Sequence, residues 1–157
     1  MTKASGTPAA VSAVPADDAA GAARKAVDAL YANDLAAQAL GIEVQSVAPG
    51  HVRVSMRVRP DMLNGHRTCH GGIIFALADM AFAFACNSYG DAMVAAGASI
   101  EFLAPVVCGE QLVATARETS RSARHGIYDV SVTGASGEPA AHFRGRCARL
   151  RAPSNAS

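Results

Sequence analysis

The hydrophobic and polar positions along the chain follow two different periods. In residues 52–58, VRVSMRV, apolar and polar side chains alternate, which is typical of a strand with one face in water. In residues 22–39 the apolar positions recur at helical spacing, and Gly41 follows as a stop signal. Residues 71–85, GGIIFALADMAFAFA, are apolar nearly all round. A helix of this kind has no polar face for water, so we expect other elements to enclose it.

Four more segments with strand character follow the apolar helix. Short turn signals separate them, so each strand is predicted to lie antiparallel beside the next. The predicted strands span residues 92–103, 111–119, 126–133 and 140–150. The overall order of helices and strands lacks the regular alternation of a doubly wound sheet. We therefore predict an α+β fold in which a strongly curved antiparallel sheet wraps around a long central helix.

The domain organisation is simple. A length of 157 residues fits one domain with one core. Residues 1–21 are rich in Ala, Pro, Ser and Asp and hold few large apolar side chains, which is typical of a disordered leader. We assign the domain to residues 22–151 and a flexible tail to residues 152–157. The sequence assigns no function to the leader.

Charge and targeting signals restrict the partners and the location. A formal net charge of +1 gives no broad field that would attract nucleic acid or a membrane surface. The apolar stretch 71–85 is shorter than the roughly 20 residues of a membrane span, and Asp79 lies in its middle. The N-terminal segment lacks the apolar core of a signal peptide. We therefore predict a cytoplasmic protein without nucleic-acid or membrane partners.

The cysteines and histidines do not form a recognised reactive or metal site. The four cysteines contain no C-x-x-C pair, so we expect free thiols packed as small apolar side chains. Cys86 has no histidine nearby in sequence, which favours an inert thiol over a nucleophile. His66, Cys69 and His70 lack the spaced partners of a metal site. A bound metal is therefore not expected.

Asp79 is the first candidate for chemistry. Its helical neighbours Phe75, Ala76, Phe82 and Ala83 offer neither charge nor a hydrogen bond. Burying the carboxylate there is costly unless a partner satisfies it or it faces a cavity. A structural acid bound to a backbone amide or to an arginine explains this pattern as well as catalysis does. A carboxylate in an apolar pocket is nevertheless what a general base or nucleophile requires.

The sequence His70-Gly71-Gly72 opens the same helix. First-turn amides have no partner within a helix, the helix dipole favours negative charge there, and glycine lets a ligand approach the backbone. The segment could form an oxyanion hole, although glycine-rich junctions are common at helix starts. Gly71 and Asp79 are eight residues apart, or about 12 Å along one helix, too far to act on one carbonyl. If both act on one thioester, they come from different chains, which predicts an obligate dimer.

Several arginines are candidates for contacts with phosphate. Arg121 and Arg124 flank a turn, and guanidinium groups suit phosphate, so these two are candidate contacts for coenzyme A. Arg144, Arg146 and Arg149 recur on the last strand, where a solvated face is the simpler interpretation for most of them. The chain contains neither a P-loop nor a dinucleotide fingerprint.

One long motif carries a family resemblance. Residues 64–90, NGHRTCHGGIIFALADMAFAFACNSYG, resemble the signature of the phenylacetic acid degradation thioesterases, a branch of the hotdog superfamily. The resemblance continues through SIEFLAP, GEQLVATA, GIYDVSV and FRGR, and covers roughly residues 35–150. It implies the hotdog fold, hydrolysis of acyl-CoA thioesters, commonly aryl-acetyl ones, and homodimers paired into homotetramers. It implies no metal and no cofactor.

The same resemblance implies roles for four residues. Asp79 would activate water or attack the thioester carbon, and the amide of Gly71 would bind the carbonyl oxygen. His70 and Asn64 would orient or polarise the thioester from the side of Gly71, opposite the aspartate of a partner subunit. Every residue of the motif is present. The sequence leaves open whether Asp79 is a nucleophile or a general base.

The expected substrate is phenylacetyl-CoA or a hydroxylated relative. Phe75, Phe82, Phe84 and Tyr89 are candidates to line an aromatic pocket, although aromatic side chains on an apolar helix more often belong to a core. Medium-chain or other aryl esters, and a hydratase of the same fold, are alternative enzymes. The alternative class is a non-catalytic acyl-CoA sensor or binding module, against which the intact Asp79 and H-G-G segment weigh.

Overall fold

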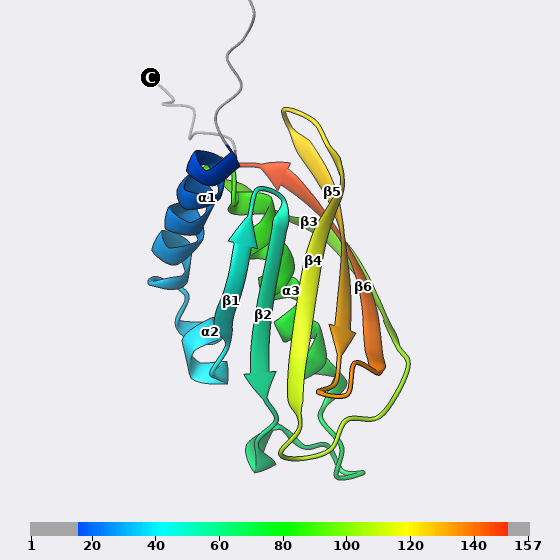
Figure 1. The fold of residues 1–157 in the computed structure, drawn as a ribbon. Coiled ribbons are helices and arrows are strands. Elements are labelled where there is room, and N and C mark those ends of the chain that lie inside the picture. The colour runs from blue at the N-terminus through cyan, green and yellow to red at the C-terminus, as the bar shows by residue number, and fades with distance from the viewer. Residues whose placement is uncertain (1–15, 151–157) are drawn as a thin grey trace, which may run out of the picture.

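A long helix lies against one face of a single curved sheet in the computed structural model, which describes residues 16–150 (Figure 1). The predicted tail, residues 152–157, and most of the predicted leader lie outside the described residues. No helix in the described range is long and apolar enough to cross a membrane.

The sheet has six strands, and all neighbouring strands run antiparallel. They are β1 (Glu43–Ala48), β2 (His51–Arg57), β3 (Met93–Phe102), β4 (Gln111–Arg121), β5 (His125–Thr133) and β6 (Pro139–Arg149). Their order across the sheet is β1-β2-β4-β5-β6-β3. The sequence predicted five of these strands. Before the apolar helix it predicted a strand or a hairpin, and it did not identify β1 separately from β2. The α+β class with a central helix is confirmed.

The central helix, α3 (Gly71–Asn87), contacts five of the six strands, β2 to β6. Its side chains Leu77, Phe82 and Phe84 are fully buried. Burial of each such side chain stabilises the fold by about 1.5–3 kcal/mol. Gly145 on β6 permits this close contact, because a Cβ at that position would lie only 2.8 Å from ring atoms of Phe82. The apolar helix is therefore the core, as its sequence predicted.

Two helices precede the sheet where the sequence predicted one. α1 (Ala16–Tyr31) packs against β1 and α3, and α2 (Leu35–Leu40) follows after a break. Asp34 separates them as an N-cap, since its side chain accepts the N–H of Ala37 at 3.0 Å. Gly41 ends α2 in the left-handed conformation, with φ of 70°, as its stop signal predicted.

α1 begins earlier than expected, at Ala16, inside the segment 1–21 that the sequence assigned to a disordered leader. Asp17 and Asp18 occupy the first turn, where the helix dipole favours negative charge. The following alanines are strong helix formers, and Ala23 is buried against the rest of the fold. The helix therefore extends beyond the predicted boundary at residue 22.

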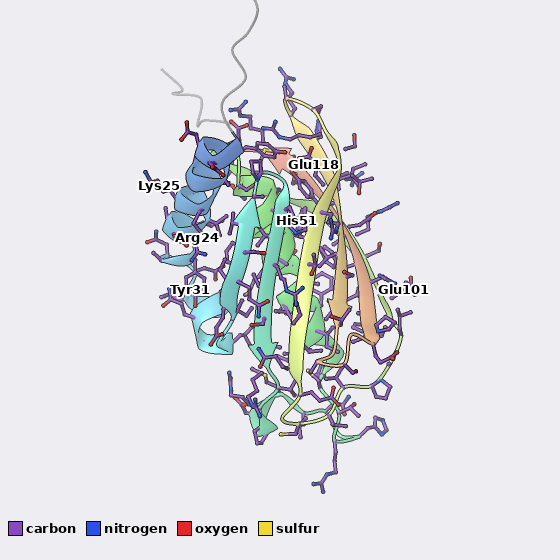
Figure 2. The ribbon with its side chains drawn as sticks, viewed as in Figure 1. Arg24, Lys25, Tyr31, His51, Glu101 and Glu118 are labelled. Carbon is purple, nitrogen blue, oxygen red and sulfur yellow. The ribbon has the colours of Figure 1, made fainter. Side chains whose placement is uncertain are left out.

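A tyrosine joins α1 to the rest of the molecule. Tyr31, labelled in Figure 2, donates a hydrogen bond to the carbonyl of Ile42 at 2.8 Å. Its ring meets that of Phe84 edge-on, with 6.1 Å between the centroids. The end of α1 is thereby held beside α3 and the start of β1.

β3 and β4 follow one another in sequence but are not neighbours in the sheet, so the prediction that each strand lies beside the next is wrong here. β3 pairs with β6, whereas β4 lies between β2 and β5. The connection, residues 103–110, passes along one end of the sheet (Figure 1). It is anchored there because the N–H of Cys69 donates to the carbonyl of Val106 at 2.7 Å. Hairpin pairing of consecutive strands is favoured by short loops, and the connection from β3 to β4 is longer than these.

β3 is an edge strand that is open to solvent. It pairs with β6 on one side, and almost all of its residues are exposed on both faces. The exposed apolar side chains include Val94 near its start and Phe102 at its end. An edge of this kind presents unpaired backbone groups to which another strand can bind.

Candidate active site

The start of α3 leaves one backbone donor free. His70 is the N-cap, and its Nδ1 accepts the N–H of Gly72 at 3.1 Å. The carbonyl of His70 accepts the N–H groups of Ile73 and Ile74 at 2.8 and 3.2 Å. The N–H of Gly71 has no acceptor among the described residues. A first-turn amide of this kind is ready to bind an oxygen that carries negative charge.

A pocket of about 370 Å³ opens beside this amide. It lies between the loop that precedes α3 and the segment that follows β3. Its lining comprises Asn64, Thr68, Cys69, Gly71, Ile74, Phe102, Leu103, Ala104, Pro105 and Val106. The ring of Phe102 covers Gly71 so closely that a Cβ on residue 71 would lie 3.0 Å from its Cζ. Glycine at this position therefore permits the close approach of the ring.

Asn64 shapes the loop on one side of this pocket. Its Oδ1 accepts the N–H groups of His66 and Thr68 at 2.9 and 3.2 Å, and its Nδ2 donates to the Thr68 hydroxyl at 3.0 Å. These bonds use the acceptor sites of the amide oxygen and leave one N–H of the side chain. Asn64 thus lies beside Gly71, as expected, and its direct contact with a substrate stays a prediction.

Asp79 lies at the middle of α3 and is half-buried. Burial, and secondly the carboxylate of Asp34, raises the pKa of Asp79 above the ordinary carboxyl value. No hydrogen bond or ion pair joins its carboxylate to a side chain or to a backbone amide in the range of the single chain that the structure describes. Phe75, Ala76 and Ala83, its helical neighbours, are only half-buried as well. The interpretation as a structural acid therefore lacks the partner that it requires.

Within one chain, the structure does not bring Asp79 and Gly71 together. Both lie on the continuous helix α3, eight residues apart. The separation is therefore about 12 Å along the axis, with the two side-chain directions rotated by about 80°. One copy of the chain cannot place both groups on the same carbonyl, which is the geometry that the sequence predicted.

The two arginines predicted to bind coenzyme A differ in their surroundings. Arg121 pairs with Asp91 at 2.8 Å, and its guanidinium carbon lies 3.9 Å from the ring centre of Tyr89. Arg124 has no side-chain partner among the described residues and borders a pocket of about 480 Å³ together with Arg149. The turn between β4 and β5, which holds Arg124 and follows Arg121, lies near the C-terminal end of α3 (Figure 1), whereas Gly71 is the first residue of that helix.

Several predicted contributors lie away from the pocket. Phe82 and Phe84 are fully buried in the core, and Phe75 packs edge-on against Phe143 with 5.4 Å between the ring centres. Tyr89 lies beneath Arg121. The prediction that these aromatic side chains could line a substrate pocket therefore fails for Phe82 and Phe84, because the sheet covers Phe82 and α1 packs against Phe84.

The cysteines have no reactive surroundings. Burial raises the pKa of the Cys86 thiol strongly, which disfavours the thiolate and supports the prediction of an inert side chain. Cys69 and Cys147 are buried too, whereas Cys108 is exposed, against the expectation of four buried thiols. It lies in the connection after β3, which runs over the surface. In the described range, no three His, Cys, Asp or Glu side chains are grouped to hold a metal.

Another pocket, of about 630 Å³, lies on the other face of the sheet. Its lining includes Glu101 on β3, which Figure 2 shows at the margin of the sheet, and the ion pair between Asp129 and Arg144. Arg144 donates to both carboxylate oxygens of Asp129, at 2.6 and 2.7 Å. The sheet separates these groups from α3, so this pocket does not belong to the candidate active site.

The sequence interpretation missed Phe102. The motif SIEFLAP had contributed only to the family resemblance. The alternation along β3 places Glu101 on the outer face of the sheet and Phe102 on the face of α3. That alternation was present in the sequence. Its meaning depended on knowing that the end of β3 meets the start of α3.

Comparison with known proteins places the chain among the thioesterases. The model of the Thioesterase superfamily matches residues 66–141. Acyl-coenzyme A thioesterase PaaI of Escherichia coli is 45% identical over 122 residues, which cover 78% of this chain and 87% of that protein. The structure of Escherichia coli PaaI, a protein of the phenylacetic acid degradation operon, matches with a TM-score of 0.84 at 42% identity. That match covers 85% of this chain and 96% of the other.

A more distant match is the structure of a complex with a ligand. A Streptococcus mutans protein bound to acetyl-CoA matches with a TM-score of 0.68 at 27% identity, and the match covers 69% of this chain and 88% of that one. Together with the thioesterases, it confirms the hotdog fold predicted from the sequence.

Proposed function

Since the chain belongs to the acyl-CoA thioesterases of the phenylacetic acid degradation branch, we propose that its substrate is phenylacetyl-CoA or a hydroxylated aryl-acetyl-CoA ester. Hydrolysis would yield the free acid and coenzyme A. The observation that carries the proposal is the N–H of Gly71, a helix N-terminal donor without an acceptor that opens onto an apolar pocket. Such a donor suits the oxygen of a thioester carbonyl as charge develops on it.

Two further groups would act on the carbonyl. Because Nδ1 of His70 accepts a hydrogen bond, a neutral ring carries its proton on Nε2, which can donate to the thioester. Asp79 of a second copy would remove a proton from water as the water attacks the carbonyl carbon. The carbon–sulfur bond then breaks, and the thiolate of coenzyme A takes up the proton. The alternative, in which Asp79 attacks directly and water opens the resulting anhydride, uses the same residues.

The proposed catalytic unit is a homodimer. The distance between Gly71 and Asp79 on α3 requires a second chain, and the edge strand β3 offers an exposed surface for it. A two-fold axis makes such an interface self-complementary and creates two identical sites. We propose that these dimers pair further into a homotetramer and that the protein works in the cytoplasm.

The same pairing suggests where coenzyme A lies. In one chain, Gly71 contacts Phe102 at the end of β3. Arg149 on β6 is paired with Met93 at the start of β3. Antiparallel pairing of two β3 strands would bring the start of one beside the end of the other. Arg124 of the second copy, next to Arg149, would then approach the site at Gly71. We assign a phosphate of coenzyme A to Arg124 rather than to Arg121, because the guanidinium of Arg121 already pairs with Asp91 and lies against the ring of Tyr89.

Thiol release from a panel of acyl-CoA esters tests the proposal, with Asp79→Asn beside the wild type. The panel contains phenylacetyl-CoA, hydroxyphenylacetyl-CoA, hexanoyl-CoA and acetyl-CoA. We expect the aryl-acetyl esters to have the highest kcat/KM and the Asn variant to lose turnover while it still binds them. Tight binding without thiol release from any ester would instead establish the alternative, a non-catalytic acyl-CoA sensor.

A further inference from the structure

Phe102 is a large aromatic side chain that the fold leaves half in solvent. It is 52% exposed, although the five phenylalanines of the chain include two that are fully buried. Leu103 and Val107, on the connection that follows, are 50% exposed each. Apolar groups gathered in one exposed segment mark a surface that contacts something else. Here that surface adjoins the free amide of Gly71, at the end of the β3 edge along which the proposed second copy would lie.

The ring of Phe102 is held in a defined place. A Cβ built on Gly71 would lie 3.0 Å from Cζ and 3.4 Å from each Cε, so the tip of the ring covers the backbone of residue 71. The strand behind it is paired, with Phe102 opposite Ala141 in the register of β3 and β6. A group bound through its oxygen to the Gly71 amide would therefore lie close to this ring.

The pocket around the ring is chemically suited to hydrocarbon. Ile74, Leu103 and Val106 contribute apolar side chains, and the polar pair Asn64 and Thr68 is hydrogen-bonded to itself. The pantetheine arm of coenzyme A carries amides that would lose hydrogen bonds with water in such surroundings. An apolar acyl group loses none. The pocket therefore fits the acyl side of the thioester better than the thiol side.

We propose that Phe102 is a specificity-determining residue, whose ring packs against the acyl group of a thioester bound at the Gly71 amide and favours aryl groups over straight chains. This inference rests on the proposed function and adds to it the residue that selects the substrate. Ring–ring contacts in edge-on or offset geometry stabilise a complex beyond the area that they bury. The buried Phe82 and Phe84 cannot make this contact.

The test measures binding without turnover. Phenylacetyl-CoA and hexanoyl-CoA are titrated calorimetrically into the Asp79→Asn protein, alone and combined with Phe102→Leu or Phe102→Tyr. We expect Phe102→Leu to weaken phenylacetyl-CoA by about three- to tenfold and hexanoyl-CoA by less than about twofold. Phe102→Tyr keeps a ring and should keep the preference. Ile127→Ala, which removes another exposed apolar side chain on β5, is the matched control and should change neither affinity.

Each outcome decides the inference. Equal losses for both esters, or no loss for either, would overturn the role of Phe102 while the thioesterase function stands. A protein that binds neither ester would overturn the role of Phe102 and the proposed substrate together. Should Asp79→Asn still release thiol, the catalytic assignment fails, and the ratio of the two affinities still decides the role of Phe102. Far-ultraviolet circular dichroism of each variant shows that the comparison is made between folded proteins.

Discussion

Asp79 and Asp129 lie on opposite sides of the sheet, Asp79 on α3 and Asp129 on the outer face of β5. The surroundings of the two carboxylates differ completely. Asp129 accepts two hydrogen bonds from Arg144 and one from Thr119, and its pKa is lowered mainly by the bonds from Arg144. Asp79 lies half-buried on α3 without such a partner in the described range, and its pKa is raised. On the outer face the charge of Asp129 is thus paired with that of Arg144. The helix side leaves a carboxylate and the amide of Gly71 unsatisfied, and unsatisfied groups are the ones available to a substrate.

Replacement of each carboxylate by its amide should produce the largest contrast. We expect Asp79→Asn to lower kcat for phenylacetyl-CoA by about a thousandfold, because the variant cannot remove a proton from water. Asp129→Asn should stay within about twofold of the wild type, since exposed ion pairs contribute little. Steady-state thiol release measures both variants. A similar loss in both would mean that the two faces do not differ in function.

A proline at residue 71 would remove the free backbone N–H with little other change to the helix. Residue 71 is the first residue of α3, a position that tolerates proline, and His70 already has the extended conformation that proline requires before it. We expect Gly71→Pro to lower kcat by about a hundredfold, through loss of one oxyanion donor. Gly71→Ala adds the same Cβ beside Phe102 but keeps the N–H, so it is the control for crowding. If alanine is as harmful as proline, crowding and not the donor explains the loss.

A mixing experiment tests whether the site spans two chains. Asp79→Asn and Gly71→Pro chains, each inactive alone, are unfolded together and refolded in equal amounts. Half of the dimers would be mixed, and each mixed dimer would hold one site without either substitution. We therefore expect about a quarter of the wild-type activity to return. No recovery, with dimers verified by light scattering, would place both groups in one chain and contradict the distance along α3.

Substitution of the two arginines near the C-terminal end of α3 should change KM by different but smaller factors. Arg124→Ala is expected to raise KM for phenylacetyl-CoA about fivefold, because a charge-assisted contact to phosphate is lost. Arg121→Ala should change KM by less than about twofold, because its guanidinium already pairs with Asp91. The N-acetylcysteamine thioester of phenylacetic acid lacks the nucleotide and is the control substrate. An equal rise in its KM would exclude a phosphate contact.

Opposite pKa shifts predict opposite effects of pH on stability. Because the folded pKa of Asp79 is raised, its ionisation destabilises the fold progressively as pH rises above the ordinary carboxyl value. The folded pKa of Asp129 is lowered, so its contribution is present above the ordinary value and is lost as pH falls through the lowered one. We expect Asp79→Asn to raise Tm at neutral pH by about a few degrees. Asp129→Asn should lower Tm by a smaller amount, because solvent screens the exposed pair with Arg144. Scanning calorimetry from pH 3 to 7 would contradict this if both variants shift Tm in the same direction.

Local sequence patterns were sufficient for most of the elements. The alternation in β2, the apolar run of α3 and the stop at Gly41 each depend on residues close together in the chain. The separation of Asp79 and Gly71 follows from helical rise alone, so the need for a second chain could be predicted too. The sequence interpretation missed the break at Asp34. The residues around Asp34 favour a helix, and one N-cap residue is a weak signal among them.

Contacts between distant segments were decided only by the tertiary structure. The sequence by itself determined the apolar helix, its unpaired first-turn amides and the position of Asp79 in its middle, because backbone geometry and side-chain chemistry act over a few residues. It did not determine that β3 pairs with β6, that Asp91 forms an ion pair with Arg121, or that the ring of Phe102 covers Gly71. Each of these depends on strand register, and a shift of one residue turns every side chain to the other face of the sheet.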